Sequence, residues 1–120
     1  MVEIRNPARE RLEAGEISVG IGIRLARSAD IASMMKTAGM DWLFIDLEHG
    51  PLTLDQTAQI SCAALSAGIS TLVRVPRGEM AMATRALDGG ALGIIMPQCE
   101  SADEAREIVD RLHYAPEGSR

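Results

Sequence analysis

The sequence lacks several features that would assign a function at once. It has no P-loop, no dinucleotide-binding fingerprint and no nucleophile elbow. Its two cysteines, Cys62 and Cys99, lie far apart and form no metal-spaced pair, which favours reduced thiols. It also lacks the apolar segment of a signal peptide and any apolar run of roughly 20 residues. We therefore expect a cytoplasmic protein that does not enter a membrane.

Positive charge is scarce as well. Twelve Lys and Arg residues stand against seventeen Asp and Glu residues, which gives a net charge of -5. This balance disfavours a nucleic-acid partner and an anionic membrane surface. The 120 residues suffice for one small domain with one modest core. Because no low-complexity linker divides the chain, we expect a single domain over residues 1–120.

The segment 42–51, WLFIDLEHGP, organises the chain. Its four apolar residues, 42–45, predict a strand that is buried on both faces. Three titratable residues, Asp46, Glu48 and His49, follow before a glycine–proline pair ends the strand. Chemistry collects at the carboxyl ends of parallel strands, which favours a functional site here. The alternative is that the acids only cap the next helix and that His49 is a surface group.

The rest of the chain predicts an alternation of strands and helices. A short helix is expected over residues 6–15, and the strands are expected at 18–24, 42–45, 70–75 and 92–96. Each strand precedes a helix, and these helices are expected at 28–38, 53–67, 79–87 and 101–113. Strand starts separated by twenty-odd residues fit consecutive βα units and a parallel sheet.

Two architectures fit these units: an open doubly wound sheet, or part of a (β/α)8 barrel. A complete barrel needs about 250 residues, so this chain would supply four of its eight units.

Gly20 and Gly22 fall inside the first strand, which suggests that backbone or a ligand approaches closely there. In the following helix we expect one stripe, Ile31, Met34 and Met35, to face the core.

Arg74 is the second informative residue, because it lies inside an apolar strand. An unpaired buried guanidinium is costly, so Arg74 should meet an anion. That anion is either Asp46 or Glu48 in an internal salt bridge, or a substrate carboxylate. An arginine beside a histidine near strand ends could hold and polarise a 2-oxo acid. Gln98 could bind a ligand or form only a turn, and Asp88 alone is typical of a helix C-terminal turn.

The motif AGMDWLFIDLEHGP at 38–51 resembles the second-strand motif of the metal-dependent (class II) pyruvate aldolases. These enzymes are of the 4-hydroxy-2-oxoheptanedioate aldolase type, in the superfamily that also holds the citrate lyase β chain. The resemblance continues in order through residues 72–76, 86–91, 94–97, 102–106 and 114–120. It implies four consecutive βα units of a (β/α)8 TIM barrel, a half-barrel with a parallel sheet and a short N-terminal helix.

The resemblance also implies retro-aldol cleavage of 4-hydroxy-2-oxo acids to pyruvate and an aldehyde. By position, His49 matches the proton acceptor, Arg74 the group that stabilises the pyruvate enolate, and Asp88 the acid that raises the basicity of the histidine. The family's divalent metal, Mg²⁺, Mn²⁺ or Co²⁺, takes a Glu and an Asp from the fifth and sixth strands, beyond Arg120. The chain therefore carries no metal ligands of its own by this resemblance, and alone it is expected to be inactive.

Other assignments stay open at this point. A citrate-lyase-type acyl lyase shares the barrel but should not rely on a strand-end histidine base. The chain could instead be a non-catalytic half-barrel that pairs with a second half, since a half-barrel leaves strand edges and a sheet face uncovered. Asp46 and Glu48 could also bind a metal through water.

Asp88 raises a geometric conflict. His49 and Arg74 belong at the carboxyl ends of strands, whereas Asp88 ends a helix and precedes the next strand. A strand of about five residues at roughly 3.3 Å each separates those faces by about 16 Å. We therefore predict that Asp88 and His49 lie more than about 10 Å apart in one chain. Asp46 should be the nearer acid on the rim, by which we mean the edge formed by the carboxyl ends of the strands. Asp88 would then act on a neighbouring subunit of a homo-oligomer with active sites at its interfaces.

Overall fold

The computed structural model describes residues 3–120. Its helices and strands alternate along the chain as the sequence predicts, although most are shorter than expected by a few residues. The elements are α1 (Pro7–Glu13), β1 (Gly20–Ile23), α2 (Asp30–Thr37), β2 (Trp42–Asp46), α3 (Leu54–Ala67), β3 (Ser70–Arg74), α4 (Met80–Asp88), β4 (Gly93–Ile95) and α5 (Ala102–Leu112). No helix in this range is long and apolar enough to cross a membrane.

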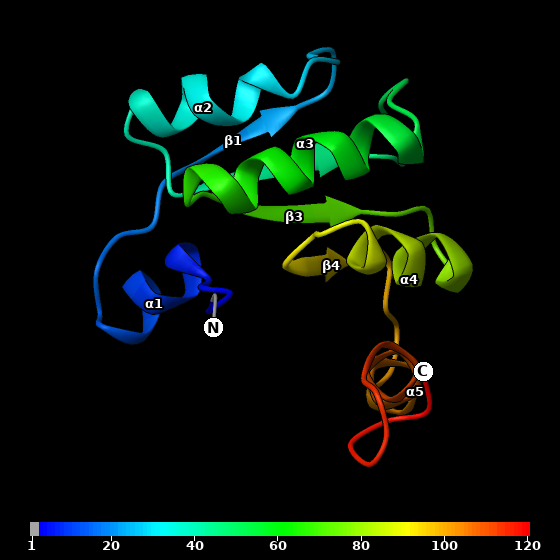
Figure 1. The fold of residues 1–120 in the computed structure, drawn as a ribbon. Coiled ribbons are helices and arrows are strands. Elements are labelled where there is room, and N and C mark those ends of the chain that lie inside the picture. Colours follow the sequence, from blue (N-terminus) through cyan, green and yellow to red (C-terminus); the bar gives the residue numbers. More distant parts are fainter. Residues whose placement is uncertain (1–2) are drawn as a thin grey trace.

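The four strands form one parallel sheet in the order β1-β2-β3-β4 (Figure 1). In register, Trp42 of β2 lies opposite Gly20 of β1 and Ser70 of β3, and the last pair of β2 and β3 is Asp46 with Arg74. A doubly wound sheet reverses its strand order at a switch point. These four strands follow chain order without reversal, which confirms successive βα units of a half-barrel.

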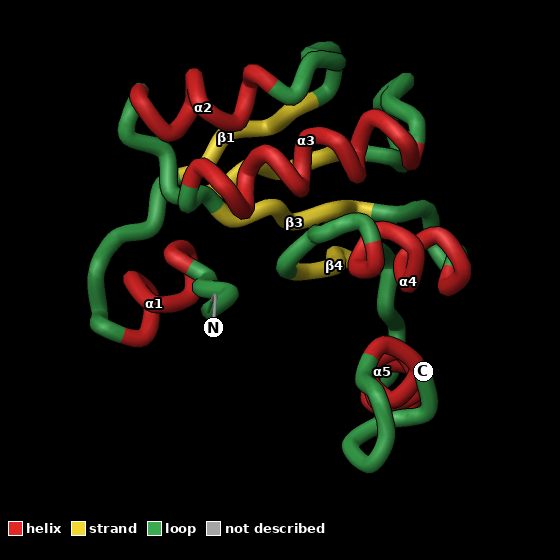
Figure 2. Tube along the Cα trace, viewed as in Figure 1, coloured by secondary structure: helices red, strands yellow, loops and turns green. Residues whose placement is uncertain are grey.

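Helices α2, α3 and α4 all lie on one face of the sheet (Figure 2). Side chains alternate along β2, so Leu43 and Ile45 on the helix-covered face are fully buried. Trp42 and Phe44 point to the opposite face and are only half-buried. The prediction that this strand is buried on both faces is therefore wrong for this chain, because its helices cover one face alone.

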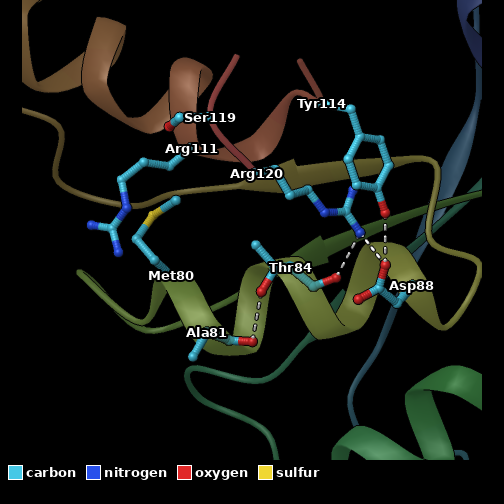
Figure 3. Close-up of a pocket in the computed structure, with 8 residues that line it drawn as sticks. All are labelled: Met80, Ala81, Thr84, Asp88, Arg111, Tyr114, Ser119 and Arg120. Atoms are coloured by element: carbon cyan, nitrogen blue, oxygen red, sulfur yellow. Dashed lines mark hydrogen bonds and ion pairs between the residues drawn. The ribbon is translucent and has the colours of Figure 1, made fainter. Parts of the chain in front are cut away.

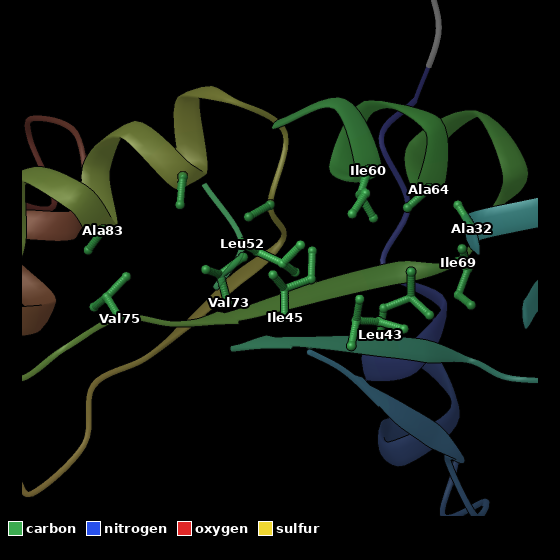
Figure 4. Close-up of a cluster of buried hydrophobic side chains, with 13 residues drawn as sticks. Ala32, Leu43, Ile45, Leu52, Ile60, Ala64, Ile69, Val73, Val75 and Ala83 are labelled. Carbon is green, nitrogen blue, oxygen red and sulfur yellow. The ribbon is translucent and has the colours of Figure 1, made fainter. Parts of the chain in front are cut away.

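The core lies between the sheet and these helices (Figure 4). Helix α3 contributes Ile60 and Ala64, both buried. Its N-terminus has a complete capping box: the Thr53 hydroxyl accepts from the Gln56 N–H, and the Gln56 side chain accepts from the Thr53 N–H. In α2 the core residue is Ala32, whereas Met34 is 59% exposed. The predicted stripe is wrong for Met34, because the helix turns that side chain away from the sheet.

The two glycines of β1 differ in their surroundings. A Cβ atom at Gly20 would overlap the indole of Trp42, so the ring lies directly against the Gly20 backbone. A Cβ atom at Gly22 would meet nothing within 4 Å. At Gly20 the close approach is made by a side chain and not by the expected backbone or ligand, and at Gly22 no protein atom makes one, so a ligand there stays a prediction.

Helix α1 lies near the amino-terminal ends of the strands. Its Ala8 N–H donates to Ser70 Oγ at the start of β3, at 3.2 Å. The same hydroxyl donates to Oδ1 of Asn6, the N-cap residue of α1, at 2.8 Å. These bonds fix α1 at one end of the sheet and leave the carboxyl ends of the strands open.

Candidate active site at the carboxyl ends of the strands

Asp46 and Arg74 form a two-bond ion pair where β2 and β3 end. Arg74 Nε donates to Asp46 Oδ1 at 3.0 Å, and Arg74 Nη2 donates to Asp46 Oδ2 at 2.7 Å. The Asp46 side chain is only 3% exposed, while that of Arg74 is 27% exposed. The guanidinium also lies over the Phe44 ring, 5.3 Å from its centroid. The internal salt bridge considered for Arg74 is therefore formed.

Asp46 also orders the loop between β2 and α3. Its Oδ1 atom accepts hydrogen bonds from the backbone N–H groups of Glu48, at 3.0 Å, and His49, at 3.1 Å. The hydrogen bond from Arg74 is the main reason that the pKa of Asp46 falls to about 2; burial opposes this shift and the two N–H groups assist it. Asp46 is thus a fixed negative charge that holds the backbone of Glu48 and His49 in place.

Glu48 lies between the cation and the imidazole. Its Oε2 atom is 3.4 Å from Arg74 Nε and 3.4 Å from His49 Nε2. The Glu48 side chain is largely buried, whereas the His49 side chain is 63% exposed. The expected nearer acid, Asp46, contacts only the main chain of His49, and Glu48 is the acid beside the ring. Sequence reasoning noted Glu48 in the cluster but assigned it no part in orienting His49.

Arg24 is a rim residue that sequence reasoning missed. It directly follows β1, and its Nη2 atom donates to the carbonyl oxygen of His49 at 2.7 Å. The available signal was an arginine directly after a strand of a parallel sheet, where functional groups collect.

Gln98, which follows β4, has a φ of 55°, uncommon for a residue other than glycine. Its side chain makes no hydrogen bond within residues 3–120.

Asp88 lies at the end of α4 and belongs to a different cluster (Figure 3). Its carboxylate pairs with Arg120 and accepts a hydrogen bond from the Tyr114 hydroxyl at 3.3 Å. The Arg120 guanidinium also stacks on the Tyr114 ring and donates to the Thr84 carbonyl. These groups line a cavity of about 490 Å³.

Asp88 and His49 make neither a hydrogen bond nor an ion pair with each other in the described part of the chain. The structure therefore brings His49 and Arg74 to one rim and places Asp88 apart from them. A separation of more than about 10 Å stays a prediction.

The rim carboxylates do not fit as direct metal ligands. Across residues 3–120, no group of three or more His, Cys, Asp or Glu side chains is placed to hold a metal ion. Both oxygens of Asp46 already accept hydrogen bonds from Arg74, and Glu48 lies against the same guanidinium. A cation placed there would have to displace Arg74 from its partners.

A parallel sheet in chain order, with an imidazole, carboxylates and a guanidinium at its carboxyl ends, defines half of a barrel-type enzyme domain. The chain belongs to the HpcH/HpaI aldolase/citrate lyase family, whose model matches residues 24–120. This membership confirms the expected family.

Similar proteins carry aldolase names. The chain is 40% identical over 121 residues to the 4-hydroxy-4-methyl-2-oxoglutarate aldolase of Hapsidospora irregularis, covering 100% of this chain and 45% of that protein. It is 36% identical to the hydroxypyruvate/pyruvate aldolase of Agrobacterium fabrum, covering 96% of this chain and 43% of that protein. The crystal structure of an HpcH/HpaI aldolase from Desulfitobacterium hafniense superposes with a TM-score of 0.87 at 36% identity, covering 93% of this chain and 43% of that one. The chain thus spans less than half the length of these relatives.

Proposed function

We propose that this chain forms the first half of a metal-dependent lyase that cleaves 4-hydroxy-2-oxo acids to pyruvate and an aldehyde. The observation that carries the proposal is the placement of His49 and Arg74 on one rim, with Glu48 between them. Membership of the aldolase/citrate lyase family supports it. The activity is proposed for the complete barrel, by which we mean this chain joined to four further βα units.

In this reaction His49 accepts the proton of the substrate's 4-hydroxyl group. The bond between C3 and C4 then breaks, the aldehyde leaves, and the bonding electron pair passes to the pyruvate fragment as an enolate. Arg74 stabilises the negative charge that develops on the C2 oxygen. Protonation of the enolate at C3 completes the formation of pyruvate.

Arg74 can stabilise an enolate although Asp46 already binds it. The ion pair uses Nε and Nη2 of the guanidinium, and Nη1 has no hydrogen-bond partner within residues 3–120. The side chain is 27% exposed, so this nitrogen can face a ligand. The proposed Mg²⁺, Mn²⁺ or Co²⁺ ion would take its ligands from outside this chain and would add positive charge in the site.

We further propose that Asp88 acts on His49 of a neighbouring copy, in a cytoplasmic homo-oligomer with active sites at its interfaces. The position of Asp88 at the end of α4, with no contact to His49 of its own chain in the described residues, supports this arrangement. Asp88 would then be a positioning residue, because it would act through the imidazole.

The decisive experiment is a retro-aldol assay on the complete barrel with Mg²⁺, Mn²⁺ or Co²⁺. Pyruvate release from at least one of a panel of 4-hydroxy-2-oxo acids is expected, and His49→Ala should lower the rate by about 10²–10⁴-fold. Lys36→Ala, which removes an exposed charge on α2, is the control and should leave the rate unchanged. Pyruvate release from no substrate would contradict the proposal. A small loss in His49→Ala would favour the acyl lyase instead.

The uncovered sheet face, with Trp42 and Phe44 half-buried, favours a second candidate: a half-barrel that acts by association. Size-exclusion chromatography with light scattering on the 120-residue chain tests it. Self-association is expected under this alternative, since the open face and the edges of β1 and β4 need a partner. A clean, stable monomer would contradict it.

A further inference from the structure

Arg24 lies level with the ion pair of the rim. The last register pair of β1 and β2 is Ile23 with Ile45, and the last pair of β2 and β3 is Asp46 with Arg74. Arg24 lies just beyond the end of β1, and continuing the register by one residue places it beside Asp46. Because side chains alternate along strands, Arg24, Asp46 and Arg74 form one row on the face opposite the helices.

The two arginines of this row differ in how their charge is balanced. Arg74 has Asp46 at 2.7 Å and Glu48 at 3.4 Å. Arg24 is exposed, and in the described residues it forms no ion pair; its only hydrogen bond is to the neutral carbonyl of His49. The neighbouring Asp46 does not pair with Arg24, because its oxygens already accept hydrogen bonds from Arg74 and from two backbone N–H groups. Arg24 is thus an uncompensated cation beside the proposed base.

A guanidinium has five N–H donors, and the bond to His49 uses one of them. The remaining donors can bind a carboxylate through two parallel hydrogen bonds, which are among the strongest in proteins. The His49 carbonyl fixes one nitrogen, so the guanidinium is held in place before any ligand arrives. Such preorganisation lowers the entropic cost of binding.

We propose that Arg24 forms a carboxylate subsite that binds the far carboxylate of a 2-oxo dicarboxylate. This inference rests on the proposed function and assigns Arg24 as the residue that selects dicarboxylate over monocarboxylate substrates. With neighbouring strands about 4.8 Å apart, the Arg24 and Arg74 backbones lie about 10 Å apart. Both guanidinium groups reach the end of β2 or the loop that follows it, Arg74 at Asp46 and Arg24 at the carbonyl of His49, so a short dicarboxylate could bridge them.

The position of His49, the proposed base, agrees with a substrate that spans Arg24 and Arg74. His49 follows β2, the strand between the two that carry Arg24 and Arg74. A substrate with its 2-oxo end at Arg74 and its far carboxylate at Arg24 would present its middle carbons to that loop. The carbon that bears the 4-hydroxyl group would then lie by the imidazole.

Isothermal titration of the complete barrel with 2-oxoglutarate and with 2-oxopentanoate tests the subsite. Neither ligand has a 4-hydroxyl group, so the binding does not depend on turnover. The unsubstituted protein should bind 2-oxoglutarate at least roughly tenfold more tightly. Arg24→Gln should abolish this preference, and Arg24→Lys should keep only part of it, because an ammonium cannot form the fork. Lys36→Gln removes one exposed charge of the same βα unit and should keep the full preference.

Each other result has a defined meaning. A preference that persists in Arg24→Gln, or no preference in the unsubstituted protein, overturns the subsite. An equal loss of affinity for both ligands also overturns it, since Arg24 would then act only through the His49 loop. Unchanged affinity for 2-oxopentanoate shows that Arg24→Gln is folded. If 4-hydroxy-2-oxoglutarate is bound with the Arg24-dependent preference but is not cleaved, the subsite stands and the proposed lyase function fails.

Discussion

The Asp46 carboxylate binds the Arg74 guanidinium through two hydrogen bonds at the last register position shared by β2 and β3. The same carboxylate accepts the backbone N–H groups of Glu48 and His49. One side chain therefore sets both the position of the cation and the course of the loop that carries the base. A change at Asp46 should disturb both together.

Asp46→Asn should destabilise the protein. The amide keeps the size of the carboxylate but loses its charge, and it leaves the Arg74 guanidinium without its main partner. We expect the free energy of unfolding to fall by roughly 1–3 kcal/mol, measured by urea denaturation of the complete barrel. Asp103→Asn is the matched control, because Asp103 pairs with Arg106 while its side chain is 95% exposed. Its loss should stay below about 0.5 kcal/mol, and equal losses would contradict the structural role of Asp46.

Stability should also depend on pH through Asp46. Its pKa is about 2 in the folded protein and 3.8 as the ordinary value. A lowered pKa stabilises the fold fully above about pH 4, and this contribution of roughly 2 kcal/mol is lost as the pH falls through about 2. Urea midpoints measured from pH 6 to pH 2 should show this loss. Asp46→Asn should remove that part of the acid dependence, and an unchanged dependence would show that other carboxylates cause it.

Gly20→Ala should be far more harmful than Gly22→Ala. At Gly20 the new methyl group would overlap the indole of Trp42, whereas at Gly22 it would meet open space. We expect Gly20→Ala to cost roughly 1–3 kcal/mol of unfolding free energy and to shift the Trp42 fluorescence, since the ring must move. Gly22→Ala should be neutral to within about 0.5 kcal/mol. Similar costs at both positions would rule out the close packing of Trp42 on β1.

The order of elements was readable from the sequence because local signals and hydrophobic pattern agreed. Thr53 and Gln56 form a capping box at the start of α3, and Gly68, with a φ of 70°, ends the same helix. Strand spacing alone left two architectures open. The strand order of the sheet decides between them, and it depends on contacts between residues far apart in the chain.

The rim was predictable in its members but not in its contacts. The placement of His49 and Arg74 at strand ends follows from the parallel sheet. Which acid meets which group depends on side-chain direction: Asp46 and Arg74 share a face of the sheet, while Glu48 lies beyond the strand and reaches both Arg74 and His49. Arg24 was missed because its importance appears only once the register of β1 and β2, continued by one residue, places it beside Asp46.

The last prediction concerns the proposed action of Asp88 on a neighbouring copy. Within its own chain the Asp88 carboxylate is held by Arg120 and Tyr114, and it has no contact with His49 in residues 3–120. If Asp88 serves the partner's active site, two variants that are each impaired should restore part of the activity when they are mixed. His49→Ala still offers an intact Asp88, and Asp88→Asn still offers an intact His49.

Mixing the two variants of the complete barrel, after dissociation and reassociation, should therefore recover part of the activity. In a random mixture of dimers, about half are mixed, and each mixed dimer has one intact site, so about a quarter of the unsubstituted activity is expected if each site uses one residue from each copy. A mixture of Lys36→Ala with His49→Ala should keep about half of the unsubstituted activity whether or not the subunits exchange, so it controls for activity lost during dissociation and reassociation. Should the His49→Ala and Asp88→Asn mixture stay as inactive as its components, while both still associate, Asp88 does not act across the interface and the proposed role of the oligomer fails.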